Sequence, residues 1–168
     1  MNANTILSVL PAQAGHFLLE SGYHSNLWVT LDTLFVDVNK VAPLVTALAE
    51  KLRPYDVTAV CGPMVGGAFL GLATARELGK RFYFTTPRPA SAEGLFKVEY
   101  ALPLQMHRMV AGERVALVDD AISAGSSVRA TKSSLDHAGA STVVVAALMT
   151  FGDTGKDYFK SRAFRSKS

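Results

Sequence analysis

Four short apolar runs, separated by segments with helical spacing, constrain the fold of this chain more than any other feature of its sequence. The runs cover residues 57–61, 81–85, 115–118 and 142–149. They show little polar alternation, which is typical of strands whose two faces are both covered by helices. The pattern therefore predicts a parallel sheet rather than an antiparallel sheet with one face in water.

Three further segments are predicted helices. Residues 39–52 repeat apolar side chains at helical spacing, residues 65–78 stop at Gly79, and residues 126–137 stop before Gly139. Strands that alternate with helices predict an α/β fold, an open and mostly parallel sheet flanked by helices and joined by right-handed crossovers. Ligands of such sheets bind beyond the carboxyl ends of the strands.

The N-terminal part of the chain departs from this alternation. Residues 4–10 predict a short helix, and residues 15–31 predict a small irregular β region because Gly and Ser interrupt short apolar pieces. We expect Trp28 in the core, and His16 and His24 as surface or packing residues.

Composition narrows the classes of protein. A length of 168 residues is sufficient for one domain with its own core. The single cysteine, Cys61, excludes internal disulfides and a cysteine-built zinc site. Without a long apolar run or a signal-peptide pattern, we expect a cytoplasmic protein with no membrane partner. The net charge of +3 is mild and the basic stretch 156–167 is short, so we expect no nucleic-acid partner.

The stretch ALVDDAISAGSSVRA, residues 116–130, carries the strongest functional signal. Asp119 and Asp120 end an apolar run, and small residues then lead into the predicted helix. Backbone N–H groups of such a loop can converge on a phosphate, while the two carboxylates accept hydrogen bonds from sugar hydroxyls. The pattern predicts a ribose 5-phosphate site, although Asp120 or Ser126 alone would also be consistent with an ordinary helix cap. The predicted phosphate-binding residues are Ala121, Ile122, Ser123, Ala124, Gly125, Ser126 and Ser127.

A second glycine-containing turn follows the first predicted strand of the sheet. Its glycines could expose N–H groups to a second anion at a helix start, or they could serve tight turning and close packing. The nucleotide motifs G-x-x-x-x-G-K-[ST] and G-x-G-x-x-G after a strand are both absent from the sequence. The candidate anion-binding residues of the turn are Gly62, Pro63, Met64, Val65, Gly66 and Gly67.

Residues 118–127 resemble the phosphoribosyl-diphosphate (PRPP) signature of the type I phosphoribosyltransferases. Residues 15–25 (GHFLLESGYHS), 61–79 (CGPMVGGAFLGLATARELG) and 110–129 (VAGERVALVDDAISAGSSVR) are similar to segments of the orotate phosphoribosyltransferase branch. The resemblance implies one phosphoribosyltransferase domain over residues 1–168. Its expected parts are an N-terminal hood (1–36), an α/β core (37–152) and a tail (153–168).

The resemblance also implies an activity, in which ribose 5-phosphate passes from PRPP to orotate and gives orotidine 5′-monophosphate and diphosphate. Mg2+ is expected as a cofactor held through PRPP, with no direct protein ligand, and a homodimer is expected. No protein nucleophile is required, because catalysis consists of positioning and charge neutralisation. The second turn becomes the diphosphate site. The implied catalytic residues are Asp119, Asp120 and Arg88, and the implied base-binding residues are Phe17, Glu20, Ser21 and Thr150.

The sequence departs from the family at several expected cations. Pro87 stands about where family members carry a lysine, which leaves Arg88 and Lys97 as the cations of that loop. Glu20 and Thr150 stand where many orotate enzymes have basic residues facing the substrate carboxylate. Two alternatives therefore stay open: a phosphoribosyltransferase for a neutral purine or pyrimidine base, and a non-catalytic regulator that binds PRPP or a nucleotide.

Overall fold

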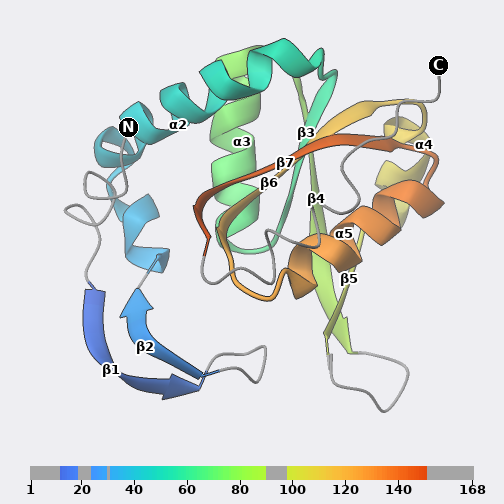
Figure 1. Ribbon diagram of the computed structural model, residues 1–168. Helices are drawn as coiled ribbons and strands as arrows, with labels where there is room; N and C mark the ends of the chain where they lie inside the picture. Colours follow the sequence, from blue (N-terminus) through green and yellow to red (C-terminus); the bar gives the residue numbers. More distant parts are fainter. Residues whose placement is uncertain (1–11, 19–23, 30, 90–97, 151–168) are drawn as a thin grey trace.

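The computed structural model describes residues 12–18, 24–29, 31–89 and 98–150, arranged as a central sheet and a separate two-stranded ribbon (Figure 1). The ribbon joins β1 (Ala12–Leu18) and β2 (His24–Val29). The sheet has the strand order β5-β4-β3-β6-β7, in which only β5 is antiparallel to its neighbour. Its strands are β3 (Ala59–Pro63), β4 (Arg81–Pro89), β5 (Val98–Ala101), β6 (Arg114–Ile122) and β7 (Ser141–Thr150).

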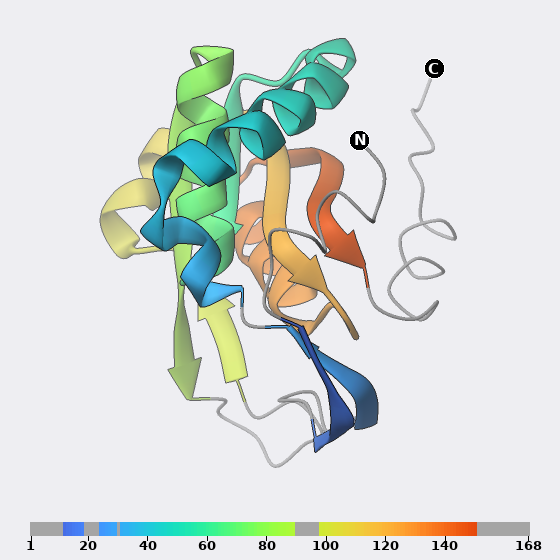
Figure 2. The ribbon, with the colours of Figure 1, turned by 90° about the vertical axis from the view of Figure 1, so that its left-hand side faces the viewer.

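Helices cover both faces of this sheet, which confirms the predicted α/β fold. Figure 2 shows α2 and α3 in front of the sheet and α5 behind it. No helix within the described residues has the length and apolar character needed to cross a membrane. The helices are η1 (Asp32–Val36), α2 (Val38–Leu52), η2 (Arg53–Tyr55), α3 (Gly66–Leu78), η3 (Leu104–Met106), α4 (His107–Val110) and α5 (Ser126–His137).

The central strands supply apolar side chains to both helical layers. Val60 and Val118 join the cluster formed with α2 and α3, whereas Cys61 and Leu117 join clusters on the face covered by α5. Successive residues of a strand point to opposite faces, so a strand buried on both sides needs apolar residues at every position. Burial raises the pKa of the Cys61 thiol to about 12, and this side chain is therefore a packing residue.

Helix boundaries agree closely with the sequence. α5 has the predicted bounds, and α3 ends at Leu78, before Gly79, whose φ of 65° gives the left-handed conformation that closes many helices. α2 begins one residue earlier than predicted, where the side chain of Asp37 accepts a hydrogen bond from the Asn39 amide at 3.1 Å. The helix predicted for residues 4–10 lies outside the described residues.

The segment after the second strand of the core differs from its predicted form. The sequence indicated a strand ending near residue 85 and a loop beyond it, but β4 continues to Pro89 and pairs with β5 as an antiparallel hairpin. Prolines at positions 87 and 89 are compatible with this pairing because β3 pairs with β4 only as far as Thr85, so the stretch 86–89 is paired on one side alone.

The order of the strands determines where a ligand can bind. The chain passes from β3 through α3 to β4 on one side, and from β6 through α5 to β7 on the other side. Because β3 and β6 are neighbours and their helices leave to opposite faces, a crevice is expected at their carboxyl ends. This is the switch point at which open α/β sheets bind ligands.

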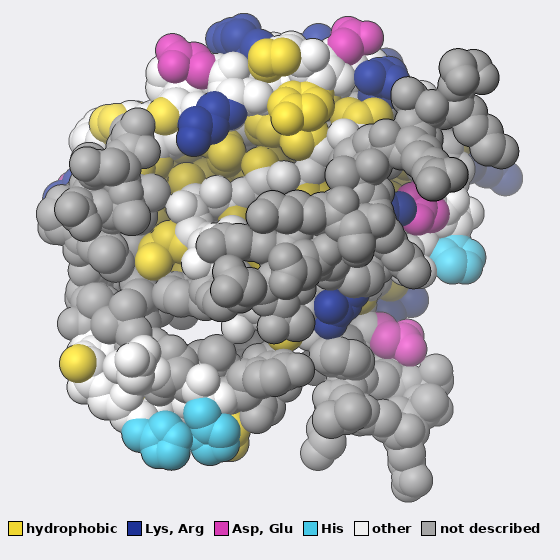
Figure 3. Space-filling model, in the orientation of Figure 1, with side chains coloured by type: hydrophobic (Ala, Val, Ile, Leu, Met, Phe, Trp, Pro, Cys, Tyr) yellow, Lys and Arg dark blue, Asp and Glu magenta, His cyan; other side chains and the backbone are white. Residues whose placement is uncertain are grey.

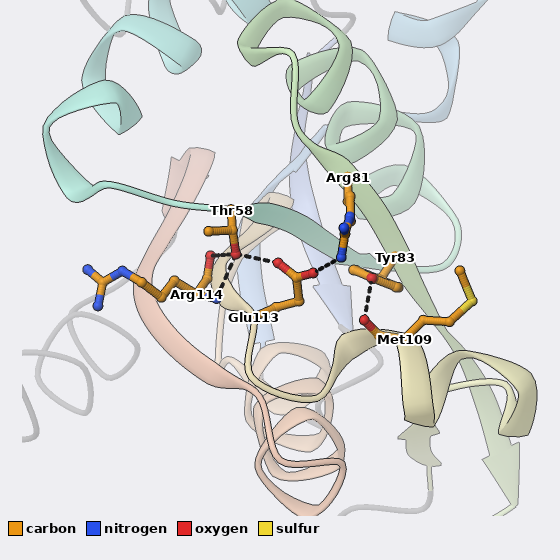
Figure 4. Close-up of polar contacts among 6 residues, drawn as sticks. All are labelled: Thr58, Arg81, Tyr83, Met109, Glu113 and Arg114. Atoms are coloured by element: carbon orange, nitrogen blue, oxygen red, sulfur yellow. Dashed lines mark hydrogen bonds and ion pairs between the residues drawn. The ribbon is translucent and has the colours of Figure 1, made fainter.

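The opposite, amino end of the sheet is held by a buried carboxylate. Glu113, which is 8% exposed, accepts hydrogen bonds from the Thr58 hydroxyl and the Arg81 guanidinium (Figure 4). The Thr58 hydroxyl in turn accepts the Arg114 amide at 2.8 Å. Glu113 therefore joins the starts of β3, β4 and β6.

We expect Glu113→Ala to lower the free energy of unfolding by about 1–3 kcal/mol, because it removes the buried carboxylate that accepts hydrogen bonds from Thr58 and Arg81. Arg81 contributes little, since its side chain is largely exposed. Urea unfolding would measure the change. Glu50→Ala, at an exposed position of α2, is the matched control and should change stability by less than about 0.5 kcal/mol. Equal stability of the two variants would contradict a structural role for Glu113.

Candidate functional site

The two segments predicted to bind anions, residues 62–67 and 121–127, meet at the carboxyl ends of β3 and β6. A Cβ atom placed on Gly66 would lie 2.0 Å from Oδ2 of Asp120, and one on Gly67 would lie 2.6 Å from Oδ1 of Asp119. Such distances leave no space for a side chain at either glycine. The start of α3 is thus packed directly against the acidic pair, where the positive end of the helix dipole favours negative charge.

The glycine-containing turn itself is equally tight. A Cβ atom on Gly62 would lie 2.0 Å from the backbone oxygen of Gly67, so the two ends of the turn are in contact. The peptide bond between Met64 and Val65 is cis. The Met64 amide donates to the Thr85 carbonyl at 2.9 Å. These contacts fix the turn that leads from β3 into α3 at the carboxyl end of β3.

Thr85 is a positioning residue that sequence reasoning missed. Its side chain is fully buried at the carboxyl end of the parallel part of β4, and its hydroxyl lies 2.7 Å from the hydroxyl of Thr131 on α5. Through its carbonyl and its hydroxyl, Thr85 connects the turn after β3 with the helix after β6. No sequence signal indicated this contact, since Thr is common in strands.

The acidic pair is held by its own local hydrogen bonds. Oδ1 of Asp119 accepts the Asp120 amide at 3.0 Å, and Oδ2 accepts the Ser127 hydroxyl at 2.9 Å. Oδ1 of Asp120 accepts the Ala121 amide at 2.8 Å. Asp119 is only 5% exposed, whereas Asp120 is half-buried. Asp120 is therefore the carboxylate better placed to meet a ligand.

Burial raises the pKa of Asp119 well above its ordinary value, and the neighbouring charge of Asp120 adds to this effect. The hydrogen bond from Ser127 opposes the shift by favouring the charged form. The site thus contains a buried carboxyl group that resists ionisation, that of Asp119, beside the more exposed carboxyl group of Asp120.

The small-residue loop is shorter than the sequence suggested. Ala121 and Ile122 belong to β6, and α5 begins at Ser126, so the connecting turn is residues 123–125. Gly125 has a φ of 73°, a conformation that side chains rarely adopt. The Ser126 hydroxyl is buried and has no partner among the described residues. An unpaired buried donor beside the start of a helix fits an anion.

Two of the predicted phosphate-binding groups are already used inside the protein. The Ala121 amide donates to Asp120, and the Ser127 hydroxyl donates to Asp119. The phosphate-binding role is therefore better supported for Ser126 and the turn before it than for Ala121 and Ser127.

Arg88 lies on the β4–β5 hairpin. Its position in the register is directly opposite Glu99, and its side chain is exposed. Opposite charges at such a cross-strand position attract each other. The predicted role of Arg88 in binding the leaving group stays a prediction. Lys97 lies outside the described residues.

The predicted base-binding residues come from two separate parts of the fold. Phe17 is on the β1–β2 ribbon, where its ring centroid lies 5.8 Å from that of Trp28, and Thr150 is exposed at the end of β7. Glu20 and Ser21 lie outside the described residues. The expectation that Trp28 is a core residue was wrong: its side chain is 40% exposed, because the ribbon stands apart from the sheet (Figure 1).

Comparison with known proteins identifies a family. The profile of the phosphoribosyl transferase domain matches residues 36–165. Orotate phosphoribosyltransferase of Wolinella succinogenes is 35% identical over 141 residues, which are 82% of this chain and 64% of that protein. The enzyme of the same name from Thermotoga maritima is 33% identical over 135 residues, 80% of this chain and 67% of that protein. The chain thus spans about two thirds of the length of these relatives.

Solved structures with this fold include enzymes for different bases. Orotate phosphoribosyltransferase of Aeropyrum pernix has a TM-score of 0.70 at 22% identity, with 98% of this chain and 90% of that chain covered. Adenine phosphoribosyltransferase of Thermoanaerobacter pseudethanolicus has a TM-score of 0.75 at 15% identity, with 96% of this chain and 95% of that chain covered. At these identities the likeness establishes the fold and does not distinguish between bases.

We expect Gly66→Ala to displace Asp120, because the new methyl group would occupy the position of its carboxylate. Displacement of a positioning group by about 1 Å can lower turnover roughly 100-fold. Gly71→Ala, in the same helix, is the control. Its methyl group would meet the Phe82 ring at 3.2 Å, where a small shift of the ring is sufficient. Turnover of PRPP would compare the variants, and equal turnover for both would contradict the packing argument.

We expect Asp119→Asn to raise the thermal stability of the ligand-free protein at pH 7. A carboxyl group with a raised folded-state pKa binds more protons in the native state, so its contribution to stability falls as pH rises above its ordinary pKa. A gain of roughly 1 kcal/mol would raise Tm by about 2–4 °C. The gain should vanish toward pH 4. Calorimetric scans would measure it, with the exposed Asp136→Asn as control; a lower Tm for Asp119→Asn at pH 7 would be the contrary result.

Proposed function

The chain belongs to the phosphoribosyl transferase domain family, and from that premise we propose that it transfers ribose 5-phosphate from PRPP to orotate, with orotidine 5′-monophosphate and diphosphate as products. The observation that carries the proposal is the direct packing of the glycine turn of α3 against Asp119 and Asp120. This packing puts two helix starts and two carboxyl groups around one crevice. A ligand with two anionic ends and hydroxyl groups between them matches that arrangement.

The start of α5 would bind the 5-phosphate. Ser126 contributes a buried hydroxyl without a protein partner, and the first N–H groups of the helix have no partner within the helix itself. Asp120 would accept hydrogen bonds from the ribose hydroxyls. Asp119, held by Ser127 and by the Asp120 amide, would act as a positioning residue that orients its neighbour.

The start of α3 would bind the diphosphate. Its first backbone N–H groups have no partner within the helix and would donate to the phosphate oxygens. During the reaction the bond from the anomeric carbon to a diphosphate oxygen breaks, and diphosphate leaves with the electron pair of that bond. The base nitrogen loses its proton and forms a bond to the same carbon. Mg2+ carried by PRPP would supply positive charge to the departing diphosphate. The oxygen atoms of PRPP itself would hold that ion.

Orotate is the preferred base because the curated relatives that match most of this chain are orotate enzymes. A neutral purine or pyrimidine base is the second candidate. Thr150 favours it, since an exposed, uncharged side chain ends β7 where a carboxylate-binding arginine was expected. A PRPP-binding regulator is the third candidate, supported by the placement of Arg88 opposite Glu99. The homodimer, the cytoplasmic location and the division into hood, core and tail stay predictions.

We expect orotate absorbance to fall when the protein is mixed with PRPP and Mg2+, and a panel of orotate, uracil and adenine would identify the base. Asp120→Asn should lower turnover about 10- to 100-fold, because a hydrogen bond to a charged group is lost. Asp136→Asn, on the exposed face of α5, is the matched control and should be as active as the parent. Turnover of a neutral base alone would favour the second candidate. Binding of PRPP without turnover would favour the third, and absence of PRPP binding would contradict all three.

A further inference from the structure

Two histidines form a close pair on the surface of the β1–β2 ribbon. Nε2 of His16 lies 2.7 Å from Nδ1 of His24, and the two rings are stacked with centroids 4.7 Å apart and planes inclined by 30°. Both side chains are exposed. Figure 3 shows two adjacent cyan side chains at the lower edge of the molecule, where the ribbon lies.

The local register of the ribbon explains why the rings meet. His24 pairs directly with Leu18, and His16 lies two residues before Leu18, on the same face of β1. The rings are therefore diagonal cross-strand neighbours, which long or aromatic side chains can bridge. A bulge places Gly15 and His16 opposite the single residue Asn26, and this irregularity alters the direction of the strand at His16.

The short distance between the two nitrogens has a chemical consequence. A neutral imidazole has one N–H group and one nitrogen with a free lone pair, so one shared proton can lie between His16 and His24. If both rings use their other nitrogen as the N–H group, both lone pairs face the same small volume. We propose that this pair is a binding site for a divalent transition-metal ion, with Nε2 of His16 and Nδ1 of His24 as its two protein ligands.

The spacing is close to what such an ion requires. Imidazole nitrogens bind zinc at about 2.0–2.1 Å, which places two ligands of a tetrahedral site roughly 3.3 Å apart. The observed 2.7 Å needs an opening of roughly 0.6 Å, which side-chain rotation on an exposed ribbon can provide. Imidazole suits Zn2+, Cu2+ and Ni2+. The described residues contain no cluster of three or more His, Cys, Asp or Glu side chains able to hold a metal, so water would complete the coordination.

A metal ion at this position would connect the two strands across the ribbon. It would link residues 16 and 24 and so hold the bulge beside Phe17 in one register. Because it binds the folded ribbon and not the separated strands, it would raise the stability of the ribbon by mass action. The site is independent of the acidic pair and of the proposed PRPP site.

Calorimetric titration of the tag-free protein with Ni2+ tests the proposal. We expect one ion per chain with a Kd below about 100 μM, and at least tenfold weaker binding in His16→Ala and in His24→Ala. The double variant should bind no more weakly than either single variant, because one lost ligand already removes the chelate. His137→Ala is the matched control, since His137 is exposed on α5, and it should keep the affinity of the parent. His16→Gln would repeat the test if His16→Ala disturbed the ribbon.

A second measurement needs no variant. Substoichiometric Ni2+ is paramagnetic and should broaden the proton resonances of the His16 and His24 rings before those of His107 and His137. Unchanged Ni2+ affinity in either single alanine variant would overturn the proposal. So would absence of Ni2+ binding by the parent protein, or broadening that begins at His107 or His137.

Discussion

The contact between the start of α3 and the acidic pair is the constraint on which the site depends. Two backbones of parallel strands lie side by side, yet their following segments leave to opposite faces of the sheet. The start of α3 can lie against the acidic pair only because Gly66 and Gly67 carry no side chains. The same contact brings partial positive charge from the helix to Asp119 and Asp120. This one contact therefore determines both the shape and the electrostatics of this end of the sheet.

The two ends of the sheet are built in different ways. At the amino end, Glu113 is buried and is matched by donors from two neighbouring strands. At the carboxyl end, Asp119 is buried beside another acid, and the Ser126 hydroxyl has no partner among the residues that the structure describes. Unmatched polar groups cost stability, and natural proteins retain them chiefly where function requires them. The acids, and not a single unpaired hydroxyl, distinguish the two ends, because the Thr142 hydroxyl at the amino end of β7 is also buried without a partner among the described residues.

Local patterns predicted the parts of the fold that depend on local forces. The bounds of α5 and the glycine that ends α3 follow from helix-capping chemistry, and the apolar runs follow from burial on both faces. The β4–β5 hairpin was missed, because pairing between distant segments leaves no short-range pattern when prolines interrupt the strand. Asp119 and Asp120 also differ in environment because of contacts with α3 and Ser127. These contacts form only in the folded chain, so two adjacent aspartates in a sequence do not reveal the difference. Trp28 was misplaced because its ribbon stands away from the core.

The chemistry of Cys61 has a practical consequence for following motion in this protein. The sequence contains one thiol, and that thiol is enclosed between β3 and the helical layer and resists ionisation. Maleimide reagents attack the thiolate form of accessible cysteines, so the parent chain should not react with them. A cysteine introduced at an exposed position, such as the end of β4 or the surface of α5, would carry the only fluorophore or spin label. Movement of that label could then be followed by spectroscopy in a chain whose own cysteine needs no replacement.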